Sequence, residues 1–399
     1  MFVFVLNCGS SSFKHQLLDM TDERRVASGV VERIGMDDSV LAYEPAGGEK
    51  TKETGQIANH EIAIKKVLDK LVDPNIGVIK SLSDIGAIGH RVVHGGEKFS
   101  GSVLITDPVI AALKQNIPLA PLHNPPNITG IEAMQKALPG TPNVGVFDTS
   151  FHASMPPESY IYALPYEWYE QYHVRRYGFH GTSHRFVSER AAQMLGIPSA
   201  QFNCITCHMG NGSSITAVRN GKSYDTSMGM TPLEGLVMGT RCGDVDAGIP
   251  SYLAANVGFS FADIDNAFNK KSGLLGISGV SSDMRDLQKA AAEGNARARL
   301  ALDVLCHRVL KYVGAYAVEL GRVDAIILTG GIGENDTLFR AAVVERLTIL
   351  GIKLDAEANK ARGAEVVIST ADSAIKVLVV PTNEELVIAR DTRDIVSKP

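Results

Sequence analysis

Two arginines and one aspartate stand where the sequence does not favour charge. Arg91 lies within the short apolar stretch 88–93. Asp148 comes directly after the apolar stretch 143–147, and Arg241 follows a glycine and a threonine. A charged group among apolar neighbours needs a partner, because burying an unpaired charge is very costly. An internal ion pair would explain either arginine alone equally well. Taken together, the three residues predict a clamp for an anion beside an acid that faces a metal ion.

Glycine clusters point to phosphate as the anion. The sequence has 38 glycines in 399 residues, more than the usual share of about 7%. They gather in short groups, at Gly95 and Gly96, Gly210 and Gly212, Gly239 and Gly243, and Gly330, Gly331 and Gly333. Glycine lets backbone N–H groups approach an anion closely. The two common nucleotide signatures, G-x-x-x-x-G-K-[ST] and a strand-borne G-x-G-x-x-G, do not occur. Three glycine-rich hairpin turns, the first followed by Ser12 and Lys14, nevertheless favour a nucleotide ligand.

Two short motifs carry weaker signals. Ser11 and Lys14 match S-x-x-K of β-lactamase-like hydrolases, but the S-D-N and K-T-G elements of those enzymes are missing. Cys204 and Cys207 form a single C-x-x-C without a second pair at metal-ligand spacing, so we expect both in the core of a strand.

The histidines divide into one candidate and several packing residues. His180 and His184 form H-x-x-x-H, but the surrounding glycines and aromatic residues predict a loop, where this spacing does not align two imidazoles on a metal. We therefore expect a structural role for His184, and packing roles for His94, His152 and His173. His180 is set apart by the arginines and aromatic residues of its loop.

Apolar patterning places these residues on strands and helices. Strands are predicted at 3–6, 12–18, 87–93, 143–147, 202–207, 215–218, 223–226, 325–328 and 377–380. Helices are predicted at 60–72, 108–117 and 296–320, with a short one at the C-terminus. The strand, glycine-serine turn and returning strand near residue 5 recur near residue 209, and each half later ends a strand in paired glycines. This repeat predicts two similar α/β domains that face one another across a cleft.

Composition excludes several classes of protein. Lys+Arg 39 against Asp+Glu 44 gives a net charge of −5 without a basic run for nucleic acid. No apolar stretch approaches the 18 or so residues that span a bilayer. An odd count of five cysteines favours reduced thiols and a cytoplasmic location. We expect no nucleic-acid or membrane partner.

Several long blocks of the sequence resemble the acetate kinase family, of the superfamily that also holds sugar kinases, actin and heat-shock chaperones. The resemblance runs nearly end to end. The matching blocks are 7–14, 89–97, 121–125, 147–152, 176–184, 208–212, 225–241, 329–335 and 381–385. It implies two duplicated actin-like (ribonuclease H-like) α/β domains flanking a central cleft. The expected domains are an acid- and metal-side domain, 1–150 plus about 385–399, and a nucleotide-binding domain, 151–384.

The resemblance also implies a reaction and its residues. ATP and acetate would give ADP and acetyl phosphate by direct in-line transfer with Mg²⁺, which Mn²⁺ can replace, in a homodimer. Arg91 would bind the carboxylate, and a methyl pocket would comprise Val93, Leu122, Phe179 and Pro232. His180 and Arg241 would stabilise the transition state, Asp148 would be the acid/base residue, and Asn7 and Glu384 would hold the metal. The nucleotide would contact His208, Gly210, Asn211, Gly212, Asp283, Met284, Arg285, Gly331, Ile332, Gly333 and Asn335.

Physical chemistry modifies one of these roles. Phosphoryl transfer depends on positioning and on neutralising charge over the equatorial oxygens, which two arginines, one histidine and Mg²⁺ do well. Acetate is already ionised at pH 7, so the forward reaction has no proton to remove. Our hypothesis is that Asp148 positions Mg²⁺ or an arginine. Two residues depart from the family: His15 stands where an aromatic residue is more usual, and Cys242, in place of serine, predicts sensitivity to thiol reagents.

Two alternatives remain open. A propionate kinase would take a slightly larger acid, but the branched Val93 should narrow the pocket where propionate enzymes tend to have alanine. An ATP-dependent chaperone or filament protein would share the architecture and phosphorylate no small acid. Such a protein would not need Arg91, His180 and Arg241 beside the γ-phosphate.

Overall fold

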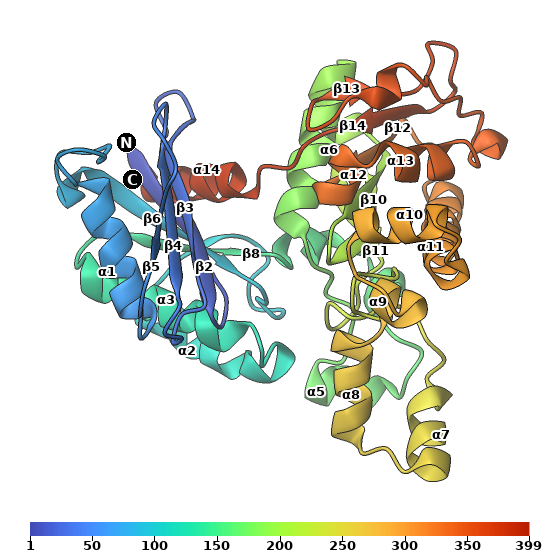
Figure 1. The fold of residues 1–399 in the computed structure, drawn as a ribbon, viewed down its shortest axis with the longest axis horizontal. Helices are drawn as coiled ribbons and strands as arrows, with labels where there is room; N and C mark the ends of the chain where they lie inside the picture. The colour runs from blue at the N-terminus through green and yellow to red at the C-terminus, as the bar shows by residue number, and fades with distance from the viewer. Residues whose placement is uncertain (399) are drawn as a thin grey trace. The chain divides into compact units, whose positions relative to one another are not determined.

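The computed structural model describes residues 1–398, and the internal contacts of the chain divide it into two compact units. The first unit comprises Met1–Ser150 and the segment that begins at Asn383. The second unit is Phe151–Thr382. This division falls two residues before the boundary expected between 384 and 385, so Glu384 belongs to the first unit. Each unit has its own β-sheet (Figure 1).

The sheet of the first unit has eight strands in the order β5-β4-β3-β2-β1-β6-β8-β7. Their bounds are β1 Phe2–Cys8, β2 Ser12–Asp19, β3 Arg24–Glu32, β4 Val40–Pro45, β5 Thr51–Thr54, β6 Ile85–Val92, β7 Val103–Leu104 and β8 Asn143–Phe147. β1, β6 and β8 run parallel, whereas β1 to β5 form an antiparallel meander. β1 and β8 read as continuous apolar runs because helices cover both faces of the parallel strands.

The second unit repeats the first strand by strand. Its strands are β9 Cys204–Met209, β10 Ser213–Arg219, β11 Lys222–Thr226, β12 Ala325–Thr329, β13 Val366–Val367 and β14 Lys376–Val379. Their order is β11-β10-β9-β12-β14-β13, with β9, β12 and β14 parallel and the other neighbours antiparallel. The series β3-β2-β1-β6-β8-β7 has the same order and directions. The predicted internal repeat is therefore present as a duplicated sheet.

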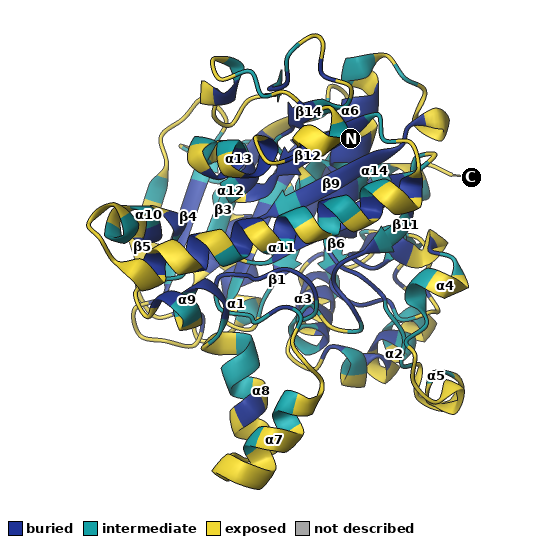
Figure 2. Cartoon of the chain, turned by 90° about the vertical axis from the view of Figure 1, so that its right-hand side faces the viewer, coloured by how far each residue is buried: buried dark blue, intermediate teal, exposed yellow. Residues whose placement is uncertain are grey.

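Helices pack on both sheets. Those of the first unit are α1 His60–Leu71, α2 Asp107–Gln115, α3 Asn124–Ala137 and α14 Glu384–Val396. Those of the second are α4 Pro157–Tyr160, α5 Tyr166–Tyr172, α6 Gly181–Leu195, α7 Gly248–Val257, α8 Phe261–Lys270, α9 Gly273–Ser278, α10 Met284–Ala292, α11 Ala296–Leu320, α12 Gly330–Asn335 and α13 Thr337–Val344. The bounds of α11 match the prediction, and the helix buries one face while exposing the other (Figure 2). Across residues 1–398, no helix combines the length and apolarity that crossing a bilayer requires.

The chain exchanges one helix between its halves. α14 follows β14 of the second unit but packs on β1, β6 and β8 of the first. In the same way, α6 comes after β8 of the first unit and packs on β9 and β12 of the second. Each sheet is therefore packed by a helix that follows, along the chain, the last parallel strand of the other sheet: α6 follows β8, and α14 follows β14. This reciprocal exchange explains why the first unit needs the C-terminal segment.

Gly330 and Gly331, expected at the end of a strand, follow β12 and begin α12, because a parallel strand leaves its sheet through a crossover. One segment differs from the local predictions. The segment after His180, predicted as a loop, is the first turn of α6. Its glycine and aromatic neighbours precede the helix, and His180 itself has φ +57° at the N-cap.

His15 is an unusual core residue of the first sheet. Its ring is 2% exposed and lies near the rings of Phe4, Phe13 and Tyr43. Neither ring nitrogen has a hydrogen-bond partner among residues 1–398. Burial lowers the pKa of His15 to about 3. A neutral polar ring therefore occupies a site whose walls are aromatic, which fits the family's usual aromatic residue here.

We expect His15→Phe to raise the free energy of unfolding of the first unit by about 1–3 kcal/mol at pH 7, because it removes a buried unsatisfied polar group. The unfolded chain protonates this histidine near pH 6.5, whereas the folded chain resists until about pH 3. The wild type should therefore lose stability as the pH falls below 6.5. The difference in the free energy of unfolding between His15→Phe and the wild type should grow over the same range. Urea unfolding followed by circular dichroism at pH 7.5 and 5.5 measures both effects. His90→Phe is the control that should destabilise, because His90 Nε2 lies 2.7 Å from Asn143 Oδ1; a pH-independent gain for His15→Phe would contradict the argument.

Candidate functional site

The first unit holds a buried ion pair at the carboxyl ends of its parallel strands. Arg91 is near the end of β6 and Asp148 directly follows β8, and these strands are neighbours. Arg91 Nε lies 2.9 Å from Asp148 Oδ1, and Arg91 Nη2 lies 2.6 Å from Oδ2. Such a two-point pair fixes the plane of the guanidinium group. In open α/β sheets this edge is where ligands bind. The internal ion pair considered for Arg91 therefore exists, at a ligand-binding position.

The electrostatics of this pair reflect its burial. Burial raises the pKa of Asp148 to about 6, with Arg91 opposing and Glu384 adding to the shift. Burial alone would lower the pKa of Arg91, but the carboxylates of Asp148, Glu384 and Glu385 outweigh it and raise that pKa. Arg91 Nη1 also donates to Asn7 Oδ1 at 3.4 Å, at the end of β1. The structure thus brings Asn7, Arg91, Asp148 and Glu384 together.

The first unit holds four more predicted residues. Val93 follows β6 and is 8% exposed, whereas Leu122, in the turn before α3, is 66% exposed. Lys14 is exposed on β2, where it pairs across the ladder with Asn7. Its strand position rules out the helical S-x-x-K arrangement of a β-lactamase-like nucleophile. Ser12 begins the same strand.

The second unit has its own cluster, at the β9–β10 hairpin. The His180 and His208 rings stack with their centroids 4.2 Å apart. A Cβ placed on Gly212 would lie 3.3 Å from Arg241 Nη1 and 3.5 Å from His180 Nε2. His180, Arg241 and the hairpin backbone therefore meet around Gly212. A Cβ at this position would be in ordinary contact with His180 and slightly too close to the Arg241 guanidinium group.

Arg241 differs from Arg91 in its partners. Its Nη1 donates to the carbonyl oxygen of Pro232 at 3.2 Å, and within residues 1–398 it forms no ion pair. Burial lowers the pKa of Arg241. The ion-pair explanation fails for this arginine, so a bound anion would supply the missing charge. Phe179, another predicted residue, is 2% exposed beside His180.

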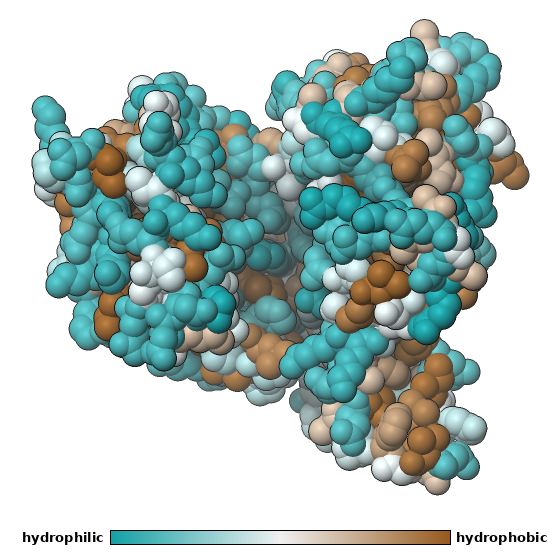
Figure 3. Space-filling model, viewed as in Figure 1, coloured by the Kyte–Doolittle hydropathy of each residue, from teal (hydrophilic) through white to brown (hydrophobic). Residues whose placement is uncertain are grey.

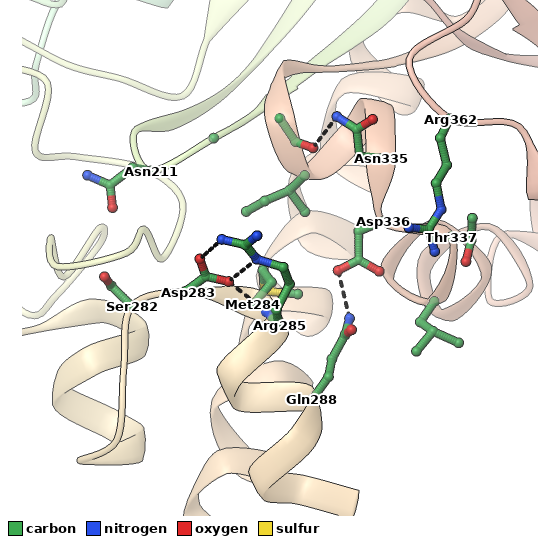
Figure 4. A pocket seen from close by; sticks show the side chains of 14 residues that line it. Asn211, Ser282, Asp283, Met284, Arg285, Gln288, Asn335, Asp336, Thr337 and Arg362 are labelled. Atoms are coloured by element: carbon green, nitrogen blue, oxygen red, sulfur yellow. Dashed lines mark hydrogen bonds and ion pairs between the residues drawn. The ribbon is translucent and has the colours of Figure 1, made fainter. Parts of the chain in front are cut away.

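A cavity of about 650 Å³ lies between the hairpin, α10 and α12 (Figure 4). Predicted residues that line it are Gly210, Asn211, Asp283, Met284, Arg285, Gly331, Ile332 and Asn335. Further lining residues, absent from the prediction, are Ser282, Gln288, Asp336, Thr337, Leu338 and Arg362. His208, Gly212 and Gly333 do not line it. Figure 4 shows Arg285 folded onto Asp283, with Nη2 2.6 Å from Oδ2. The Arg285 side chain lowers the pKa of Asp283 to about 2.

Sequence reasoning missed residues that hold these parts in place. Asn127 donates to the carbonyl oxygen of Cys8 at 2.7 Å and accepts from the N–H of Val93 at 3.0 Å, which ties β1 to β6. Arg340 is fully buried, and its donors reach the carbonyl oxygens of Gly333, Glu334, Asn359 and Ala361 and Oδ1 of Asn359. It fixes α12 to the segment beside Arg362. Isolated polar residues in helices gave no sequence signal for these roles.

The remaining motifs have structural explanations. His180 and His184 both hydrogen-bond to Ser214 Oγ, at 2.8 and 2.7 Å. The H-x-x-x-H spacing therefore brings both rings to one hydroxyl group. Groups of three or more metal-ligating His, Cys, Asp or Glu side chains are absent from residues 1–398. Cys204 and Cys207 are buried in β9 as free thiols, which confirms that prediction. Cys242 is half-buried and burial raises its pKa, which reduces the thiolate available to reagents.

Comparisons with known proteins agree with one another. Residues 2–390 match the model of the Acetokinase family. The chain is 58% identical over 398 residues to an acetate kinase of Desulfitobacterium hafniense (strain Y51), covering 100% of both. It is 54% identical over 396 residues to that of Carboxydothermus hydrogenoformans, covering 99% of each chain. The structure of Porphyromonas gingivalis acetate kinase is similar with a TM-score of 0.95 and 50% identity, over 99% of this chain and 100% of the other. The structure of a propionate kinase from Francisella tularensis is similar with a TM-score of 0.93 and 43% identity, over 99% of each chain.

We expect Gly239→Ala to weaken the binding of ADP at least tenfold while leaving the unfolding temperature nearly unchanged. The new Cβ would lie 2.0 Å from Oδ1 of Asn211, so that flexible side chain must leave its place in the cavity. Titration calorimetry with ADP measures the affinity. Gly314→Ala is the matched control, because nothing lies within 4 Å of its Cβ. Equal ADP affinity in the two variants would remove Asn211 and Gly239 from the nucleotide site.

Proposed function

The chain belongs to the acetokinase family, and from this premise we propose that it transfers the γ-phosphoryl group of ATP to acetate, reversibly and in line, to give ADP and acetyl phosphate. The observation that carries the proposal is the contrast between two partly buried arginines. Arg91 is held in one orientation by a carboxylate, whereas Arg241 lies beside His180 without a counter-charge. The first arrangement suits recognition of a planar carboxylate. The second suits neutralisation of a phosphoryl group in transit.

The first unit supplies the acid-binding residues. Arg91, oriented by Asp148, receives the carboxylate of acetate. Val93 and Leu122 provide apolar contacts for its methyl group. An apolar pocket of this kind discriminates by volume, and one methylene is worth about 1–3 kcal/mol.

The second unit supplies the nucleotide-binding residues. The cavity beside Asp283, Met284 and Arg285 receives the nucleoside, and Gly331, Ile332, Gly333 and Asn335 of α12 line the path of the phosphates. His208 and the hairpin Gly210–Asn211–Gly212 approach the phosphates with backbone N–H groups. His180 and Arg241 then stabilise the charge on the equatorial oxygens.

The oxygen ligands of the first unit fit a divalent cation. Asn7 and Glu384 would hold Mg²⁺, or Mn²⁺ in its place, since Mg²⁺ commonly takes one or two protein oxygens and completes its shell with water and phosphate. The absence of a larger ligand cluster from residues 1–398 agrees with that pattern. When bound, the cation would neutralise charge on the β- and γ-phosphates.

Apolar side chains on the second unit support a homodimer. Figure 3 shows hydrophobic residues gathered over α7. Val245, Val257, Phe259 and Phe261 are 44–80% exposed in this region. Exposed apolar groups of this size are typical of surfaces that a partner covers. We propose that a second copy of this cytoplasmic enzyme covers them.

Hydroxylamine trapping tests the reaction and the pocket together, because acetyl phosphate gives a detectable hydroxamate. With ATP and Mg²⁺, we expect rates in the order acetate, then propionate, with formate and butyrate slower. Val93→Ala should raise the ratio of propionate to acetate kcat/KM about tenfold, since it makes room for one methylene. Val92→Ala removes the same atoms from the neighbouring core position and should leave the ratio unchanged.

Three results would count against these assignments. An unaltered acid preference in Val93→Ala would refute the pocket. No hydroxamate with any acid, despite ATP hydrolysis, would favour a chaperone or filament ATPase. A wild type that prefers propionate would make the protein a propionate kinase.

Asp148→Asn tests whether Asp148 orients Arg91 or acts as a base. An amide oxygen still accepts one guanidinium N–H, so we expect turnover to fall roughly 10–100-fold and KM for acetate to rise. The pH–rate profile of Asp148→Asn should keep the same rising and falling limbs as the profile of the wild type. If a limb present in the wild type disappears in the variant, Asp148 is the acid/base residue and our hypothesis is wrong.

A further inference from the structure

A continuous chain of hydrogen bonds runs from the interior of the second sheet to His180. It comprises Thr206 on β9, His184 on α6, Ser214 on β10 and His180 at the N-cap of α6. His184 Nδ1 lies 2.7 Å from Thr206 Oγ1, and His184 Nε2 lies 2.7 Å from Ser214 Oγ. Ser214 Oγ is in turn 2.8 Å from His180 Nδ1. Thr206, His184 and Ser214 are 0% exposed, so water does not interrupt the chain.

Thr206, at the interior end of this series of hydrogen bonds, determines which group donates and which accepts in each bond. The Thr206 hydroxyl has one proton, and the carbonyl oxygen of Thr216, 3.4 Å away, is an acceptor for it. With that proton on the Thr216 side, Thr206 accepts from His184, which places the proton of that ring on Nδ1. Burial lowers the pKa of His184 well below its usual value, so the ring is neutral and its Nε2 accepts. The Ser214 hydroxyl donates to this Nε2 and consequently accepts from Nδ1–H of His180.

This direction limits what His180 can do at its other nitrogen. Nε2 is the ring atom that approaches Gly212, on the side where Arg241 Nη1 lies. With Nδ1 already protonated, a neutral ring offers only a lone pair at Nε2. Nε2 can donate to an anionic oxygen only when the ring carries both protons and is a cation. The charged and titratable neighbours of His180 are Arg241, the stacked His208, and neutral His184, whose ring centroid is 6.4 Å away.

We propose that Thr206, His184 and Ser214 are positioning residues that hold a proton on Nδ1 of His180, so that His180 acts on the migrating phosphoryl group as an imidazolium cation beside Arg241. This inference rests on the proposed function. An anion at Gly212 lies between two cationic groups and favours the second proton on the ring. The arrangement couples the full charge of His180 to the presence of the phosphoryl group. Thr206 influences that charge although it lies two side chains from His180.

Histidine side-chain NMR tests the chain without reference to activity. In ¹⁵N-histidine-labelled full-length protein, assigned with His180→Asn, we expect His180 to be the Nδ1–H tautomer when neutral. Thr206→Val keeps the shape of the side chain but removes the acceptor for His184. The His184 proton should then move to Nε2, Ser214 should donate to His180, and His180 should change to the Nε2–H tautomer. Thr206→Ser should restore the wild-type spectrum.

Kinetics tests the consequence. Thr206→Val should lower kcat about tenfold with KM for acetate and ATP unchanged, because the substrates still bind but the transition state loses a cation. Thr216→Val is the matched control: Thr216 is the cross-strand neighbour of Thr206, is equally buried, and bonds instead to Thr226. It should leave the tautomer and kcat unchanged.

The outcomes separate the two proposals. An Nε2–H tautomer of neutral His180 in the wild type overturns the inference, and this result needs no variant to fold. The inference also fails if Thr206→Val leaves the His180 signals unchanged, or if Thr216→Val alters them equally. If the tautomers behave as expected but the wild type makes no acyl phosphate, the proposed function fails and the proton chain stands.

Discussion

The cost of burying charge governs both clusters of this protein. A guanidinium group removed from water must meet a carboxylate, several carbonyl oxygens or a bound anion. Arg91 uses the first solution, with two short bonds to Asp148. Arg340 uses the second, with its donors shared among backbone carbonyl oxygens and Asn359. Among residues 1–398, Arg241 contacts one carbonyl oxygen and the sulfur of Met238, which leaves its charge largely unbalanced.

These three solutions correspond to three tasks. A fully satisfied arginine such as Arg340 can only hold structure, because none of its donors is available to a ligand. A paired arginine such as Arg91 keeps one edge, Nη1, for a weaker contact and is oriented by the other. Arg241, which has no carboxylate partner among residues 1–398, keeps donors that are available to an anion. The three arginines therefore differ in how far protein groups satisfy their charge.

The duplicated sheet explains why such groups occur twice. In each unit a hairpin precedes two parallel strands, and the parallel strands end at one edge. Asn7 and Arg91 stand at that edge in the first unit, and His208 and the Gly212 hairpin at the corresponding edge in the second. The same arrangement of strands thus places different polar side chains at the same edge in the two copies. The chain returns to the first unit at its C-terminal end, where α14 packs on β1, β6 and β8.

The sequence by itself determined the fold class, the repeat, most strands and the long helix 296–320, because apolar periodicity and glycine turns are local properties. Long motif blocks likewise determined the family and the candidate residues. Tertiary structure alone decided which arginine is paired, because a partner 57 positions away leaves no local pattern. It also decided that the segment after His180 is helical, and that Asn127, Arg340 and the Thr206–His184–Ser214 chain support the site. Hydrogen bonds between distant segments depend on how strands and helices come together, and no spacing along the chain encodes them.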